Sequence, residues 1–309
     1  NNFIKLEWSG QAPLTASGLQ SVVIPDSPVY LALDVTPAMT LTATTASDKP
    51  PATAAGPDAL KAAATSQGSP FDNFRNAISA YEPVYLVAGN RDGANARYQL
   101  SFKYRLHSPT DPSKPGFLDN FYIGYTQTAL WDLHSDSIPF VDTTYNPSLF
   151  WSKDAIWETP DQKWFIGLNA GVEHRSNGKS GDDSRSINDF YIEPAFNYRM
   201  AGGSTLSFMP RAKVYFATDR DMHYEDYQGY VDWKLRWAQD NGLAASALYR
   251  LGKSGRHAVE LGLAWPLRRT PLNMNGYLYL QYFQGYGETL LGYDQKSSPQ
   301  IRLGIGFVP

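Results

Sequence analysis

The sequence predicts an all-β protein: an antiparallel transmembrane β-barrel of about twelve strands that follows an N-terminal extension. Three observations lead to this prediction. Apolar and aromatic residues alternate with polar residues at a period of two along most of the chain after residue 80. No helical pattern separates these stretches, which indicates antiparallel neighbours. One face of the stretches is aromatic and the other is charged, as expected for a wall between lipid and a polar interior.

The first 72 residues differ from the rest and are interpreted as a periplasmic extension. Short apolar runs at 21–24 and 29–35 could form a few strands. Residues 36–72 are rich in Ala, Thr, Ser and Pro, a composition that cannot bury a core and that favours a linker, with room for a short helix around 58–65. We therefore expect an extension at 1–72 and the barrel at 73–309.

The clearest strand lies at 96–107, ARYQLSFKYRLH, where Tyr98 and Leu100 share one face and Arg97 and Lys103 share the other. Similar stretches follow along the chain. An even number of strands, each about ten residues long, is typical of bacterial membrane barrels. The expected strands lie near 82–90, 96–107, 119–130, 145–152, 163–176, 187–198, 204–217, 226–238, 243–251, 256–266, 275–286 and 299–308.

Composition excludes several classes of protein. The net charge of -3 provides no basic excess, so we expect no nucleic-acid partner. The absence of cysteine excludes a disulfide framework and a thiol nucleophile. A soluble β-sandwich is the alternative fold, but its strands are usually shorter and its polar face is rarely so charged beside so aromatic an apolar face.

Lengths of the links predict the orientation of the barrel. If the N-terminus is periplasmic, links after odd-numbered strands are external and links after even-numbered strands are periplasmic turns. The tight turns at 201–204 and 239–242 follow even strands, and the longer link at 217–226 follows an odd one. The long link at 107–116 breaks this trend, because it follows an even strand and would be periplasmic. The asymmetry of the other links matches outer-membrane barrels and puts the link after the fifth strand outside.

A polar cluster at 171–191, GVEHRSNGKSGDDSRSINDFY, surrounds that link. The fifth strand carries its apolar residues at even positions up to Val172, and His174 and Ser176 continue the same count. They should therefore face lipid near the outer rim. On the next strand Asn188 has the parity of the apolar residues, and the link would bring it back beside His174.

Serine, histidine and asparagine on one outward patch could act as nucleophile, base and orienting residue. A neutral asparagine avoids exposing a carboxylate to lipid. The alternative is that all three side chains lie at the membrane interface and reach water in the loops. We favour catalysis because three polar residues converge on a face that is otherwise apolar.

These residues resemble the signature of the outer membrane phospholipase A family. The matching residues are His174-x-Ser176-Asn177-Gly178, then Ser184-Arg185-Ser186-x-Asn188, then Tyr191. Residues 126–151 and 285–293 resemble further segments of the family, and the resemblance covers roughly 73–309. It implies a calcium-dependent phospholipase A1 or A2 in the bacterial outer membrane, active as a homodimer. Its substrates would be phospholipids and lysophospholipids of the outer leaflet.

Carried over to this sequence, the resemblance implies that Ser176 is the nucleophile, His174 the base and Asn188 the residue that orients the base. The implied Ca²⁺ ligands are the Ser184 hydroxyl, the Lys179 carbonyl and the carbonyl of Ser137 of the partner subunit. Lys179 replaces the usual arginine of the family, which a backbone ligand tolerates.

Two further features bear on the implied dimer and its calcium. Gln127 matches a glutamine of the family's dimer interface. Asp182 and Asp183 could bind calcium or could simply be solvated loop acids, and both readings stay open.

Two other functions are consistent with a barrel. A channel needs a wide, water-filled lumen, whereas twelve strands make a narrow barrel. A structural barrel or adhesin would tolerate the loss of Ser176. The inward residues could fill the lumen as a salt-bridged core, and these are Arg97, Lys103, Arg105, Glu173, Glu193, Arg211 and Lys213.

Overall fold

The computed structural model describes residues 18–23, 30–35, 70–108, 115–137, 139–217, 222–240 and 242–308. The chain divides into two compact units, Asn1–Ser66 and Gln67–Pro309. In the first unit, β1 (Gly18–Val23) and β2 (Tyr30–Val35) form an antiparallel hairpin, as the apolar runs there predict. The short helix expected around 58–65 lies outside the described residues.

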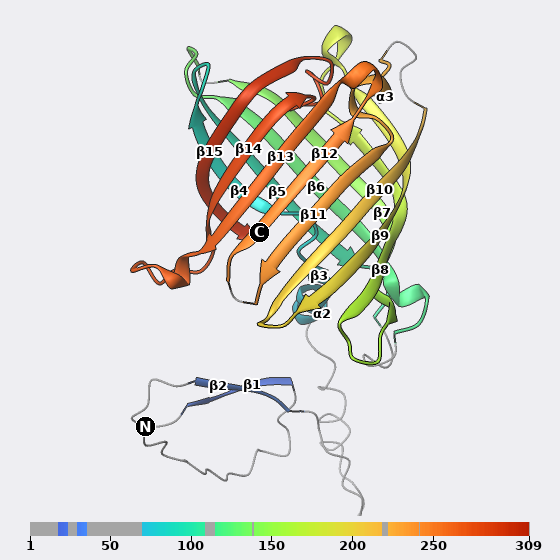
Figure 1. Cartoon of the computed structure of the whole chain (residues 1–309), viewed down its shortest axis with the longest axis vertical. Helices are drawn as coiled ribbons and strands as arrows, with labels where there is room; N and C mark the ends of the chain where they lie inside the picture. The colour runs from blue at the N-terminus through green and yellow to red at the C-terminus, as the bar shows by residue number, and fades with distance from the viewer. Residues whose placement is uncertain are drawn as a thin grey trace, which may run out of the picture. The chain divides into compact units, whose positions relative to one another are not determined.

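The second unit is a closed antiparallel barrel, in which each strand pairs with its neighbour in sequence and the last strand pairs with the first (Figure 1). The predicted fold class is therefore confirmed. Its twelve long strands are β4 (Val84–Asn90), β5 (Ala94–Arg105), β6 (Phe121–Asp132), β7 (Phe140–Glu158), β8 (Trp164–Ser176), β9 (Ser186–Met200), β10 (Ser204–Phe216), β11 (Val231–Gln239), β12 (Ala244–Leu251), β13 (His257–Pro266), β14 (Tyr277–Tyr286) and β15 (Lys296–Val308).

Short elements complete the unit. They are helix α2 (Pro70–Ala77), strand β3 (Ile78–Ser79), helix α3 (Glu225–Gln228) and the 3-10 turns η1 (Leu118–Asn120), η2 (Gly181–Asp183), η3 (Lys253–Gly255) and η4 (Leu267–Arg269). Among the described residues, no helix is long and apolar enough to cross a membrane.

Two strands differ from the prediction. The strand expected at 226–238 begins at Val231, because residues 225–228 form α3 and Tyr227 packs against Tyr286 and Tyr293. The strand expected at 145–152 extends over 140–158, and its pairing with β8 shifts between Lys153 and Trp157. Aromatic spacing in a one-turn helix can imitate strand alternation, which explains the first error.

The outward face of the barrel is apolar. Its exposed side chains include Leu86, Ile123, Leu149, Phe190, Ile192, Trp233, Leu235, Leu261, Leu263, Trp265, Ile301 and Leu303. So continuous an apolar surface is stable only against lipid, as expected for a transmembrane barrel.

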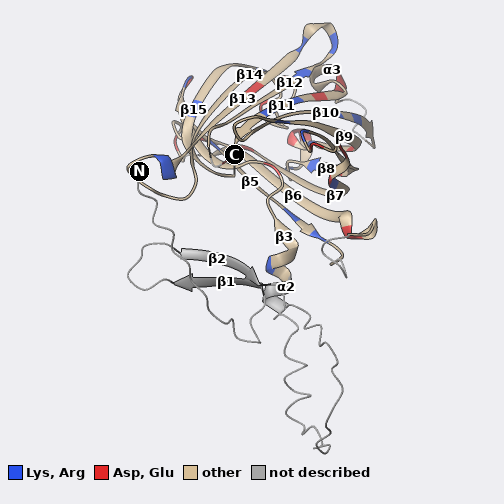
Figure 2. Cartoon of the chain, turned by 60° about the horizontal axis from the view of Figure 1, so that its bottom comes forward, with Lys and Arg blue, Asp and Glu red and all other residues tan. Residues whose placement is uncertain are grey.

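Charged residues lie on the strands as well as in the loops (Figure 2). On the strands, the inward positions are largely polar and ion-paired. Arg97, Glu173, Glu193, Arg211 and Lys213 are buried and have ionic partners, as predicted for a salt-bridged interior.

Two of the predicted interior cations lie over an aromatic ring. Lys103 Nζ and Arg105 Cζ lie 4.8 and 5.5 Å from the centre of the Tyr122 ring. A cavity of about 540 Å³ remains among the inward side chains.

An inward bulge, residues 80–83, interrupts the first strand of the barrel. Ser79 pairs with Lys103 and Tyr85 pairs with Gln99, so the first strand advances six residues while β5 advances four. The extra residues turn side chains across the lumen. Tyr81 stacks on Phe150 with a centroid separation of 4.7 Å.

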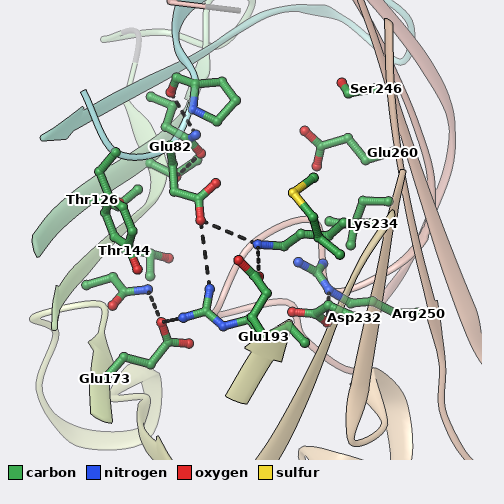
Figure 3. A pocket seen from close by; sticks show the side chains of 18 of the residues that line it. Glu82, Thr126, Thr144, Glu173, Glu193, Asp232, Lys234, Ser246, Arg250 and Glu260 are labelled. Atoms are coloured by element: carbon green, nitrogen blue, oxygen red, sulfur yellow. Dashed lines mark hydrogen bonds and ion pairs between the residues drawn. The ribbon is translucent and has the colours of Figure 1, made fainter. Parts of the chain in front are cut away.

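Glu82, in the same bulge, reaches the opposite wall. Its carboxylate lies 3.4 Å from Lys234 Nζ on β11 and 3.8 Å from Arg211 Nη1 on β10 (Figure 3). The inward bulge therefore bridges the lumen electrostatically.

At the end of the barrel that carries α3, apolar side chains cover the lumen. Ile187 of β9 packs with Met222 and Tyr224 from the link after β10, and with Leu290 and Tyr293 from the link after β14. This cluster and the inward bulge occupy part of the lumen, and the cavity of about 540 Å³ remains among the inward side chains.

We predict that Glu82→Ala lowers the free energy of unfolding by about 1–3 kcal/mol, because the half-buried Lys234 loses a charged hydrogen-bond acceptor and the buried Arg211 loses an ionic partner. Urea titration in detergent micelles, followed by tryptophan fluorescence, measures the change. The matched control is Glu158→Ala, which removes a half-exposed ion pair with Arg199 and should cost about 0–1 kcal/mol. Equal effects of the two variants would contradict the bridging role of the inward bulge.

We also predict that the barrel folds without residues 1–69. The two compact units divide at Ser66 and Gln67, and the truncated chain would keep α2 and the inward bulge. Heat-modifiable gel mobility of the refolded protein measures barrel formation. A truncated chain that stays in the unfolded band would refute this independence.

Candidate active site

The polar cluster lies where β8 and β9 pair at the α3 end of the barrel. His174 is directly opposite Asn188 in the antiparallel ladder, and Ser176 is opposite Ser186. The intervening residues Glu173 and Arg175 line the lumenal cavity. Side chains alternate across a strand, so His174, Ser176 and Asn188 belong to the outward, lipid-facing side. The observed register is the one that the even-position count predicts.

A hydrogen bond joins the two residues that the sequence pairs as base and orienting group. His174 Nδ1 lies 2.9 Å from Asn188 Oδ1. The Asn188 amide nitrogen donates to the Ala217 carbonyl at 3.2 Å, so the amide oxygen is the atom turned toward the imidazole. The oxygen can only accept, hence Nδ1 carries the proton and Nε2 keeps a free lone pair. This is the tautomer that a general base needs.

Ser176 follows His174 by two residues on the same face. Within the described residues its hydroxyl contacts Gly178 rather than His174: the Gly178 N–H donates to Oγ at 3.2 Å. Rotation of the serine about χ1 would turn Oγ toward the imidazole, and such contacts are often loose without substrate. Gly178 has a φ of 67°, which a glycine adopts without strain and which aims its N–H back at Ser176.

Asn177 organises the link between β8 and β9, a role that the sequence analysis did not assign. Its amide nitrogen donates to the Asp183 carbonyl at 2.8 Å. Its amide oxygen accepts from the N–H groups of Lys179 at 3.3 Å and Arg185 at 3.0 Å. The Asn-Gly pair at 177–178 is a turn signal that could have indicated this role.

The predicted calcium ligands lie in links at the same end of the barrel. Ser184 is exposed after η2, and the Lys179 side chain reaches away to the Val141 carbonyl, 3.0 Å from its Nζ. Ser137 is exposed with a φ of 67° in the link before β7.

Hydroxyl and carbonyl oxygens are ligands that Ca²⁺ prefers, so the chemistry of this set fits the ion. In the described part of the chain, no group of three or more His, Cys, Asp or Glu side chains could hold a metal ion. Asp182 and Asp183 are exposed within η2.

Gln127 is a polar residue among apolar side chains. It accepts from the Tyr125 hydroxyl and donates to the Tyr98 hydroxyl, both at 3.0 Å. Its polar groups are therefore partly satisfied within one chain, and its expected place in a dimer interface stays a prediction.

Residues 72–308 match the family model of phospholipase A1. The chain belongs to the phospholipase A1 family. A phospholipase A1 of Escherichia coli K12 is 30% identical over 245 residues, which cover 76% of this chain and 74% of that protein. A relative from Neisseria meningitidis serogroup B is 29% identical over 71% of this chain, and the chain spans 56% of that relative's length. The family and the ester-hydrolase class predicted from the sequence are thus confirmed.

Solved structures agree on the fold. The outer membrane phospholipase of Salmonella typhi, a dimer with bound calcium, superposes with a TM-score of 0.61 at 24% identity, covering 78% of this chain and 94% of the other. At this identity the likeness establishes the shared barrel fold.

We predict that Ser176→Ala and His174→Ala each abolish ester hydrolysis, by about 10⁴-fold or more, while the barrel stays folded. Both side chains face outward and support no core. Asn188→Ala should be roughly 100-fold less severe, because asparagine orients the base and makes no bond. Release of fatty acid from mixed micelles measures turnover, with gel mobility as the folding check. Near wild-type turnover by either of the first two variants would disprove their assignment, and Ser246→Ala in the lumen is the control.

Proposed function

We propose that this protein is a calcium-dependent phospholipase of the bacterial outer membrane that hydrolyses acyl ester bonds of phospholipids and lysophospholipids in the outer leaflet. The observation that carries the proposal is the His174–Asn188 pair beside Ser176 on the lipid-facing wall of a barrel of the phospholipase A1 family. The orientation that puts this end outside leaves the N-terminal extension in the periplasm.

In the proposed reaction, His174 Nε2 takes the proton of the Ser176 hydroxyl as Oγ attacks the acyl carbonyl. Asn188 Oδ1 holds the imidazole in the required tautomer and stabilises the imidazolium that forms. The carbonyl oxygen becomes an oxyanion, and the Gly178 N–H that now donates to Oγ lies within reach of it.

When the tetrahedral intermediate collapses, the imidazolium gives its proton to the leaving glycerol oxygen and an acyl-enzyme remains. His174 then deprotonates a water molecule, which attacks the acyl carbonyl. As the second tetrahedral intermediate collapses, the bond from the acyl carbon to Ser176 Oγ breaks, the imidazolium returns its proton to Oγ and the fatty acid is released. Bound Ca²⁺ would supply positive charge beside the oxyanion. The chain's own residues hold the base, the nucleophile and one oxyanion donor.

Substrate reaches this site from the side. Val172 lies on the outward face of β8, four residues before Ser176. On the neighbouring strands β9 and β10, Phe190 stacks on Phe216 with ring centroids 4.5 Å apart. A phospholipid that diffuses laterally in the leaflet can lay its chains along this apolar surface. The lumenal cavity is lined by many polar and ion-paired side chains and offers acyl chains no comparable apolar surface, which disfavours a lumenal active site.

We propose that the Ca²⁺ ligands are the Ser184 hydroxyl, the Lys179 carbonyl and the carbonyl of Ser137 of the partner subunit, so that the homodimer is the active state. Support comes from the oxygen-donor chemistry of these residues and from the calcium-bound dimer of the Salmonella relative.

We predict that EDTA abolishes activity, and that Ser184→Ala raises the calcium concentration for half-maximal activity by about tenfold or more. A calcium-titrated phospholipase assay measures both effects. Ser180→Ala is the matched control, because it removes from the same link a hydroxyl that makes no capping hydrogen bond to η2.

Dilution into excess detergent should lower turnover as dimers dissociate. Full activity in EDTA, or in a verified monomer, is incompatible with the shared site. If a folded barrel shows no hydrolysis at any calcium concentration, the result would instead favour the alternative of a non-enzymatic structural barrel.

A further inference from the structure

Charged side chains lie in the lumen directly behind the proposed catalytic pair. Glu173 and Arg175 flank His174 on β8, and Asp189 follows Asn188 on β9. Arg175 Nη2 and Asp189 Oδ2 are 2.6 Å apart, and Asp189 is fully buried. The Arg175–Asp189 ion pair on the lumenal face thus lies directly behind the His174–Asn188 hydrogen bond on the lipid face.

The two contacts occupy the same part of the ladder. Glu173 is opposite Asp189 and Arg175 is opposite Ile187, so the His174–Asn188 rung lies between these two rungs. The Arg175–Asp189 pair therefore crosses diagonally behind the His174–Asn188 rung. It ties β8 to β9 at the point where the base must stay within hydrogen-bond distance of its orienting amide. Removal of the tie would let the two strands shear or separate at their rim.

Arg175 is itself held from two other directions. Its Nε lies 3.5 Å from Glu173 Oε1, and Glu173 Oε2 in turn lies 2.8 Å from Arg211 Nη2 on β10. Its Nη1 donates to the Tyr224 hydroxyl at 3.1 Å. The guanidinium is therefore fixed in place and can act as a rigid tie.

The link between β10 and α3 contacts both faces of the wall at this point. On the lipid side the Ala217 carbonyl accepts from the Asn188 amide, and on the lumenal side Tyr224 accepts from Arg175. Burial raises the pKa of Tyr224, so the phenol stays neutral beside the Arg175 guanidinium. The link between β10 and α3 thus contacts both the Asn188 amide and the Arg175 guanidinium.

We propose that Arg175 and Asp189 are positioning residues that set the geometry between His174 and Asn188. The proposal rests on the proposed function, since it assigns these residues to the same reaction. The base and its amide face lipid, and one hydrogen bond joins them in the described part of the chain. Their alignment therefore depends on the side of the wall that faces the lumen.

Kinetics of Arg175→Met in mixed micelles test the proposal. We expect kcat per folded enzyme to fall about tenfold or more, because small misplacement of catalytic groups is costly, while KM changes less than about twofold. Arg175→Lys, which keeps a cation opposite Asp189, should recover most of kcat. The rate at which a sulfonyl fluoride labels Ser176 should fall with kcat, since it also depends on an aligned base.

Arg250→Met is the matched control. Arg250 Nε lies 2.9 Å from Asp232 Oδ1, between inward side chains of β11 and β12, which carry no proposed catalytic residue. We expect its kcat to stay within about twofold of the wild-type value. Equal losses in Arg175→Met and Arg250→Met, or wild-type kcat in folded Arg175→Met, would overturn the positioning role.

Two further variants keep the outcome decisive. If Arg175→Met fails to fold, Asp189→Asn against Asp232→Asn gives the same comparison with nearly isosteric changes, and equal kcat values for that pair overturn the proposal.

Ser176→Ala is assayed alongside, to separate failure of the positioning role from failure of the proposed function. Activity that survives Ser176→Ala refutes the proposed function, whereas an inactive Ser176→Ala with a fully active Arg175→Met refutes the positioning role alone.

Discussion

Closure of the sheet is the constraint on which the rest of this structure depends. Once β15 pairs with β4, every strand has one face in lipid and one in the lumen, and each side chain must suit the face that its parity gives it. The apolar wall, the ion-paired interior and the outward direction of His174, Ser176 and Asn188 all follow from that division. A one-residue slip would exchange the two faces of a strand and remove all of these features together.

The two faces solve the problem of buried polarity differently. Toward lipid, a polar side chain has neither water nor many neighbours, so His174 and Asn188 bond to each other and Asn188 to a backbone carbonyl. Toward the lumen, full charges are acceptable because partners come from several strands at once. Arg211, for example, faces Glu173 from β8 and Glu82 from the inward bulge. Neutral polar groups on the lipid face and paired charges on the lumenal face are therefore the expected arrangement in such a wall.

Alternation of side chains carries nearly all of the information that the sequence offers here. It predicts the twelve strands, the parity of His174 and Asn188 and the charged interior, because a period of two is a local property. It fails where the periodicity is broken: Tyr227 imitates a strand position from within α3, and β7 continues past its register shift. The inward bulge and the Arg175–Asp189 pair depend on the relative register of strands. The contact between Ser176 and Gly178 depends on a loop conformation, and none of these follows from a local pattern.

The inward bulge also affects how the barrel can be sealed. Glu82 belongs to the first strand of the cylinder, yet it meets Lys234 across 152 positions of sequence. Before the seam between β4 and β15 closes, Arg211 can pair with Glu173 and Lys234 with Glu193, but the Glu82 carboxylate has not yet met these two cations. Closure of the seam therefore coincides with completion of the ion-pair network in the lumen. An assembly intermediate that inserted early would carry the Glu82 carboxylate into the bilayer without these partners, so electrostatics favours a late and concerted final step over gradual strand-by-strand insertion.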